Sequence, residues 1–138
     1  MLALAAFSAS AQSSYTWNGL GGDDNFGTGA NWVGGNAPGS LQSFLNFAGS
    51  TRLTPNNNYS DYAGGFQIYF NSGAGAFTVG GNHIKFYDFG GTSPVIQNDS
   101  SSLQTINFGF GVGSPSGGTA MNINPNSCLL YTSPSPRD

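Results

Sequence analysis

Charged residues are scarce in this chain, and their scarcity excludes whole classes of partner. They make up 7% of the 138 residues, against about a quarter in ordinary soluble domains. Only Arg52, Lys85 and Arg137 are cationic, and the formal net charge is -3. Because no basic surface is available to neutralise a phosphate backbone, we exclude nucleic acid as a partner.

Chemically active side chains are equally few. The sequence contains no glutamate, one histidine, His83, and one cysteine, Cys128. The carboxylates of Asp61, Asp88 and Asp99 stand singly between turn residues, and no Gly-x-Ser-x-Gly motif accompanies His83. Because most catalytic and metal-binding arrangements lack their parts, we predict a non-catalytic chain that holds no cofactor and no metal.

Long apolar runs are absent as well. The first 11 residues, MLALAAFSASA, are apolar and small, but they fall short of the about 20 residues that a membrane-spanning helix needs. Ala9-Ser10-Ala11 fits the small-x-small pattern at which secretory signals are cleaved, although the basic region that usually precedes such a stretch is missing. We predict that residues 1–11 are the remnant of an export signal and that this fragment has no membrane span.

The composition changes abruptly in the last segment, residues 128–138. The string CLLYTSPSPRD has none of the glycine and asparagine of the preceding hundred residues. It resembles translated sequencing-adapter read-through, so we predict an artefactual tail and base no redox or disulfide argument on Cys128. A genuine Pro-Ser linker is the alternative. Residues 113–127 are predicted to be a loop or a truncated continuation of the fold.

The centre of the chain consists of short alternating segments separated by turn residues. Apolar and polar side chains alternate through residues 44–47, 66–70, 84–86 and 106–110, and a period of two is typical of strands. Clusters of Gly, Asn, Ser and Asp lie between them, and these residues favour turns. No stretch has a helical period, so an all-β fold is predicted.

The spacing favours a short right-handed β-solenoid (β-helix), with a β-sandwich as the alternative. The intervals from Ile68 to Ile84 and from Ile84 to Ile106, about 16 and 22 residues, each suit one coil. In a solenoid the backbone pairs between coils about 4.8 Å apart, so a thin core and few charges suffice. Residues 41–112 are expected to form about three to four coils, with these three isoleucines in a shared interior.

Outward-facing side chains follow from the same alternation. Ile84 and Phe86 are predicted to face inward, and His83 and Lys85 to face solvent. Three tyrosines are candidates for a partner surface, although aromatic residues are also common strand formers: Tyr59, Tyr62 and Tyr69.

The most specific stretch is TWNGLGGDDNFGTGANW at residues 16–32. It resembles the start of mature autotransporter-associated β-strand repeat proteins, which open with W-x-G, a Gly/Asp/Asn turn and A-N-W. The resemblance continues through residues 52–54, 70–79 and 104–107, and covers about residues 15–112. Phe26 stands where a second Trp is common. The resemblance implies the N-terminal fragment of a β-helical, passenger-like bacterial surface protein, without family-wide catalytic residues.

Two interpretations of this motif differ in where they place its tryptophans. If Trp17 and Trp32 close the first coil, both are buried, because an open solenoid end exposes apolar interior and unpaired strand groups. If they bind sugars, both are exposed, with Asn18, Asp23 and Asn31 as hydrogen-bonding neighbours. We favour capping, because a single motif at the start of a chain is explained by its position.

The same segment offers oxygen atoms that suit a calcium ion. Residues 21–25, GGDDN, resemble a glycine-rich calcium repeat. Such sites are built from tandem copies, and only one copy is present. We therefore favour a solvated turn.

The predicted organisation is a signal remnant at 1–11, an N-terminal capping segment at 12–40 and solenoid coils at 41–112, followed by the two segments described above. We predict a non-catalytic structural or adhesive passenger fragment, secreted or held at the bacterial outer membrane. Its expected partners are glycans, neighbouring cell surfaces and further solenoid coils. Two alternatives stay open: a carbohydrate-binding module that uses Trp17 and Trp32, and a polysaccharide-degrading β-solenoid enzyme, which requires converging Asp side chains.

Overall fold

The fold is all-β, as the alternation predicted. The structure is a computed structural model that describes residues 13–39, 43–88, 93–113, 121–126 and 128–132. Within these ranges the only helix is a single 3-10 turn, η1 (Gly29–Asn31), and no helix there is long and apolar enough to cross a membrane. The predicted signal remnant lies outside the described residues.

Sheet A forms one wall and contains the longest strands. Its strands run in the order β1, β2, β5, β8, β11, and every neighbouring pair is parallel. The bounds are β1 (Ser13–Trp17), β2 (Ser43–Phe47), β5 (Phe66–Phe70), β8 (Val95–Asn98) and β11 (Asn122–Pro125).

Sheets B and C form the other two walls, again with parallel pairing only. Sheet B contains β3 (Asn56–Asn57), β6 (Thr78–Gly81), β9 (Gln104–Asn107) and β12 (Leu129–Tyr131). Sheet C contains β4 (Ala63–Gly64), β7 (Ile84–Tyr87) and β10 (Phe110–Gly113).

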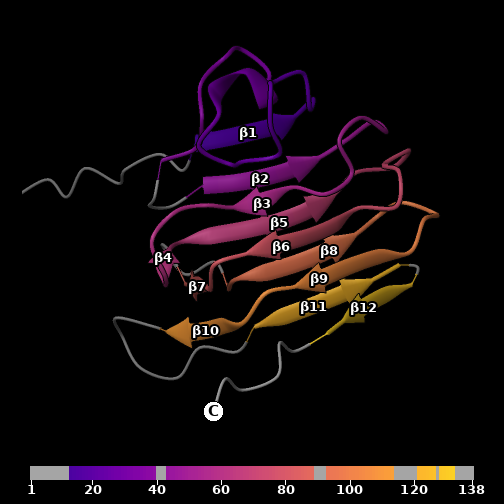
Figure 1. The fold of residues 1–138 in the computed structure, drawn as a ribbon. Coiled ribbons are helices and arrows are strands. Elements are labelled where there is room, and N and C mark those ends of the chain that lie inside the picture. Colours follow the sequence, from indigo (N-terminus) through magenta and orange to yellow (C-terminus); the bar gives the residue numbers. More distant parts are fainter. Residues whose placement is uncertain (1–12, 40–42, 89–92, 114–120, 127, 133–138) are drawn as a thin grey trace, which may run out of the picture.

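The chain visits the walls in turn and so winds a β-solenoid of about four turns. The first turn is β2-β3-β4, the second β5-β6-β7, the third β8-β9-β10 and the fourth β11-β12. Figure 1 shows the strands stacked in this order, with β1 and its loop above the first turn. The backbone hydrogen bonds run between turns, as predicted, and we call residues 13–39 the cap.

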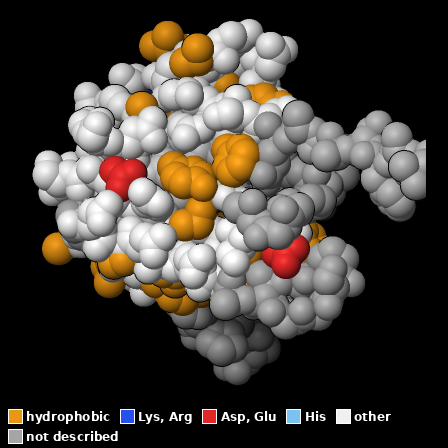
Figure 2. All heavy atoms as spheres, turned by 180° about the vertical axis from the view of Figure 1, so that it is seen from behind, with side chains coloured by type: hydrophobic (Ala, Val, Ile, Leu, Met, Phe, Trp, Pro, Cys, Tyr) orange, Lys and Arg blue, Asp and Glu red, His pale blue; other side chains and the backbone are white. Residues whose placement is uncertain are grey.

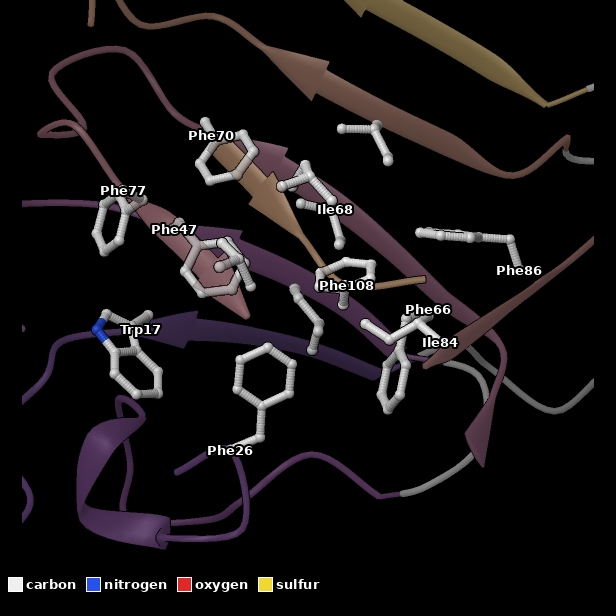
Figure 3. Close-up of a cluster of buried hydrophobic side chains, with 14 of the residues drawn as sticks. Trp17, Phe26, Phe47, Phe66, Ile68, Phe70, Phe77, Ile84, Phe86 and Phe108 are labelled. Carbon is white, nitrogen blue, oxygen red and sulfur yellow. The ribbon is translucent and has the colours of Figure 1, made fainter. Parts of the chain in front are cut away.

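The interior is filled by alternate side chains of the strands. In β5, Phe66, Ile68 and Phe70 are fully buried. In β7, Ile84 and Phe86 are fully buried, while Lys85 and Tyr87 are partly exposed. Figure 3 shows rings from the cap and from the turns pointing into one interior. Burying each such side chain contributes about 1.5 to 3 kcal/mol.

Buried amide side chains form hydrogen bonds with backbone groups at the bends between the sheets. The Gln104 amide donates to the carbonyl of Gly75 and accepts from the backbone N–H of Phe77, at 2.8 and 2.9 Å. The Asn57 amide likewise donates to the carbonyl of Asn82 at 2.8 Å. Each of these bonds joins successive turns, so Asn57 and Gln104 are bonded to backbone groups at the bends, whereas the buried Nε2 of Gln67 has no hydrogen-bond partner among the described residues.

The three isoleucines used to estimate the coil length share the interior, as predicted, but they do not occupy equivalent positions. Ile68, Ile84 and Ile106 are all buried. Ile68 lies on sheet A and Ile84 on sheet C of the same turn, while Ile106 lies on sheet B of the next. The interpretation of each interval as one coil was therefore wrong, and Ile68 instead pairs with Ile96.

The fourth turn occupies the segment in which the sequence predicts a loop and an artefactual tail. β11 pairs with β8, and β12 pairs with β9. All four residues of β11 are exposed, and β12 is mostly exposed. Backbone pairing along an open sheet edge accepts almost any extended sequence, which explains strands here despite the poor apolar pattern. The artefactual origin of residues 128–138 stays a prediction.

Candidate functional site

The two tryptophans of the cap meet edge to face. Trp17 is the last residue of β1. Trp32 directly follows η1 and forms an antiparallel bridge to Trp17. Their ring centroids lie 5.1 Å apart at 87°. Phe26 lies beside both rings, at 5.7 Å from Trp32 and 6.3 Å from Trp17. Edge-to-face packing of this kind adds stability beyond the buried area.

Both indoles are buried, with 1% of their surface exposed, and both N–H groups are bonded. Trp17 Nε1 donates to the carbonyl of Arg52 at 3.1 Å, and Trp32 Nε1 donates to the carbonyl of Phe26 at 2.8 Å. Beneath them lies Phe47 of the first turn, 6.2 Å from each indole. Neither tryptophan presents a ring face or a donor to a sugar, and both lie as the capping interpretation requires.

Asn31, a predicted sugar ligand, is instead a buried connector of the cap loop. Its Oδ1 accepts from the backbone N–H of Gly21 at 2.9 Å. Its Nδ2 donates to the carbonyls of Asp23 and Asn25, at 2.8 and 3.1 Å. One side chain therefore satisfies three backbone groups of the GGDDN turn.

The other two predicted polar ligands also bond within the loop. Asn18 Oδ1 accepts from the backbone N–H of Leu20 at 3.1 Å. The exposed Asp23 carboxylate accepts from the backbone and side-chain amides of Asn25, each at 3.0 Å. A hydrogen bond from the Thr28 side chain, and then the one from the Asn25 backbone, hold the pKa of Asp23 below its usual value. The side-chain oxygens of Asn18 and Asp23 therefore already accept hydrogen bonds within turns.

Asp24 ties the cap to the first turn. Its carboxylate accepts from Thr54 Oγ1 at 2.6 Å and from Arg52 Nη1 at 3.0 Å. The hydrogen bond from Thr54, followed by the one from Arg52, lowers the pKa of Asp24. The backbone adds two bonds, from Asn56 to the carbonyl of Asp24 and from Phe26 to the carbonyl of Asn56, at 2.8 and 2.9 Å.

The cap thus covers the first-turn edges of two sheets. β1 pairs with the edge of sheet A along its whole length, and residues 24–26 pair with the edge of sheet B at Asn56. Open strand edges invite pairing with other chains. The aromatic cluster and these two pairings close that end of the solenoid.

A second cluster of polar and aromatic side chains lies on the outer face of sheet C. His83 Nδ1 lies 2.9 Å from Asp61 Oδ1, which also accepts from the His83 backbone N–H. Their side chains are 41% and 59% exposed, and the Tyr62 ring stacks on the His83 ring. His83 and Lys85 lie on the outward side of β7, as the alternation predicted. The pairing with Asp61 was missed, since the three carboxylates of Asp61, Asp88 and Asp99 were each expected to stand alone.

The packing of Phe26 in the cap and the Asp24–Arg52 pair between the cap and the first turn were also missed. The position of Phe26 within the tryptophan motif was a signal for its burial, whereas nothing local connects residue 24 with residue 52. Among the residues that the structure describes, no three His, Cys, Asp or Glu side chains are grouped as a metal site would need.

Comparison of the chain with protein-family models, curated proteins and solved structures finds no match.

Proposed function

We propose that this chain is a non-catalytic scaffold segment of an extracellular bacterial surface protein, of the type represented by autotransporter-associated β-strand repeat proteins. The observation that carries the proposal is a stack of parallel turns closed at one end by the Trp17–Phe26–Trp32 cluster. Such stacking makes a stiff rod whose sides are open for contact. The order of the motifs around the tryptophans supports this type, because the same residues that carry the resemblance build the cap.

The surface composition supports a role in contact with other surfaces. Figure 2 shows a face with few charged groups, formed mostly by uncharged polar and backbone atoms with scattered hydrophobic side chains. A neutral polar surface suits glycans and neighbouring cells better than it suits highly charged polymers. Export places the protein at the cell surface or in the medium, where further solenoid turns are its structural partners.

The location is tested with antibodies against the purified chain, applied to intact and to permeabilised cells of the source organism. We expect labelling of intact cells or recovery from the medium. Labelling that requires permeabilisation contradicts the proposal. The non-catalytic role is tested by incubating the chain with a panel of polysaccharides, and release of new reducing ends would establish an enzyme instead.

A further inference from the structure

On the outer face of sheet C, strand β10 presents only glycines. Outward positions on and just before β10 are occupied by Gly109, Gly111 and Gly113, because Phe110 and Val112 lie in register with the inward-facing Ile84 and Phe86. In the register of the sheet, Gly111 lies beside Lys85 and Gly113 beside Tyr87. Space is therefore free over β10 for side chains from neighbouring strands.

Three rings lie over these glycines. A Cβ atom added to Gly109 would overlap the His83 ring; one added to Gly113 would lie 3.0 Å from Tyr87 Cε1, and one added to Gly111 would lie 3.6 Å from Tyr62 Cε1. The Tyr62 and His83 rings stack with centroids 5.1 Å apart and an interplanar angle of 19°. We call Tyr62, His83 and Tyr87 the ring platform.

The platform is exposed at Tyr62 and His83, and it has charged groups beside and over its rings. Tyr62 is 53% exposed. The Asp61 carboxylate lies beside His83, and Lys85 Nζ lies over the Tyr87 ring, 5.1 Å from its centroid. Within the described part of the chain, Lys85 forms no ion pair. Exposed rings with both a hydrogen-bond donor and an acceptor beside them are suited to a ligand with apolar faces and polar edges.

The backbone of Tyr62 is strained, with φ of 57°. This left-handed conformation costs a bulky residue about 1 to 2 kcal/mol, whereas Gly and Asn adopt it readily. Tyr62 nevertheless occupies the position, and its ring is directed across the sheet instead of into the core. A strained residue with an exposed aromatic side chain is a reason to look for a ligand.

We propose that the ring platform binds a neutral polysaccharide of linked pyranose sugars. The C–H groups on the face of an equatorially substituted sugar carry partial positive charge and pack against the negative face of an aromatic ring. The sugar hydroxyls hydrogen-bond to Asp61 and Lys85. The charges of the chain favour an uncharged ligand. At the platform the positive charge of Lys85 is offset by the negative charge of Asp61, and a chain with a net charge of -3 does not attract an anionic polymer. The site extends the scaffold role but rests on different residues from the cap.

The test uses the full chain and cellohexaose, a soluble β-1,4-linked glucose oligomer, in isothermal titration calorimetry. Tyr62→Asn removes a ring and suits the left-handed backbone, so the thermal midpoint is retained while the affinity falls about 3- to 10-fold. Tyr87→Ala gives a similar loss, and the double variant loses more than about 10-fold. Tyr62→Phe retains the ring face and therefore retains binding.

Tyr69→Ala is the matched control, because this half-buried tyrosine lies on the outer face of sheet A; it leaves the affinity unchanged. Circular dichroism verifies the fold of each variant, and if Tyr87→Ala unfolds, Tyr62→Asn alone decides. The proposal is overturned if the parent chain fails to bind cellohexaose, if polygalacturonate binds more tightly, or if only Tyr69→Ala removes binding. None of these outcomes depends on where the protein is located, so the scaffold proposal is judged separately.

Discussion

The indole of Trp17 joins the cap to the first turn. It contacts Phe26 and Trp32 within the cap and Phe47 of β2, and its N–H is bonded to the carbonyl of Arg52. Trp17→Ala removes all of these contacts together and leaves a cavity, so we expect the free energy of unfolding to fall by about 3 to 5 kcal/mol.

Urea denaturation followed by circular dichroism measures this loss. Leu20→Ala is the control, because Leu20 is an apolar residue of the same loop that is 73% exposed. Its effect should stay within about 0.5 kcal/mol. Equal losses in the two variants would show that Trp17 does not stabilise the cap through burial.

Asn31 provides a test of hydrogen bonding without a change in volume. In Asn31→Asp, an oxygen replaces the Nδ2 that donates to the carbonyls of Asp23 and Asn25. Two carbonyls then face a carboxylate in a buried position, and we expect a loss of about 2 to 5 kcal/mol. Thermal unfolding at neutral pH is the measurement.

The matched variant is Asn18→Asp. The Asn18 Oδ1 acts as an acceptor for the Leu20 N–H, and a carboxylate also accepts that bond. The melting temperature should therefore change little. If Asn18→Asp is as destabilising as Asn31→Asp, added negative charge in the loop is the cause, and the role assigned to Asn31 is wrong.

At the scale of elements, the cap loop depends on an ionised Asp24. Bonds from Thr54 and Arg52 lower the pKa of Asp24 below 3.8 in the folded chain. A carboxyl whose pKa is lower when folded stabilises the protein above its unfolded pKa, and this contribution is lost as the pH falls through the folded value. The melting temperature should therefore decrease below about pH 4, partly through Asp24 and partly through Asp23, whose pKa is also lowered.

Asp24→Asn separates these two contributions. Since Asp24 is partly exposed, we expect the variant to lose only about 0.5 to 1 kcal/mol at pH 7. The difference in melting temperature between parent and variant should narrow from pH 7 to pH 2.5. A difference that stays constant over this range contradicts a stabilising role for the charge on Asp24.

The strands were more predictable than their assembly. Alternation in residues 84–86 gave the correct inward and outward sides of β7, because a strand with one buried face must alternate. The length of a turn was not predictable from Ile68, Ile84 and Ile106. Interior side chains are apolar on all three sheets, so the sequence does not show which sheet each one belongs to. β3 and β4, of two residues each, are too short to produce a periodic pattern.

The candidate sites were also predicted only in part: the burial of the tryptophans was predicted, and the ion pairs were not. Burial of Trp17 and Trp32 followed from their place at one end of the repeat. The Asp24–Arg52 pair joins the cap to the first turn, and the Asp61–His83 pair joins the first turn to the second. Such contacts depend on the register between turns, and that register is set by backbone pairing that carries little sequence signal.

At the scale of the whole molecule, stability should vary along the solenoid axis. In such an array each turn contacts only its neighbours. β5 lies between β2 and β8, and its apolar side chains are buried. Within the described residues, β11 pairs only with β8, and β12 only with β9, and both strands are largely exposed. Local opening should therefore require less free energy in the fourth turn than in the second.

Hydrogen–deuterium exchange of the full chain, followed by mass spectrometry of peptides, measures this gradient. We expect peptides from β11 and β12 to exchange first and those from β5 and β6 to exchange last, because opening β5 disrupts pairing on both sides. In Trp17→Ala, protection from exchange should decrease in β1 and β2 and change little in β8 and β9. The lost stability affects first the strands that contact Trp17 or pair with β1. If all turns exchange at one common rate in both proteins, the solenoid unfolds as a single cooperative unit and its turns do not behave as separable layers.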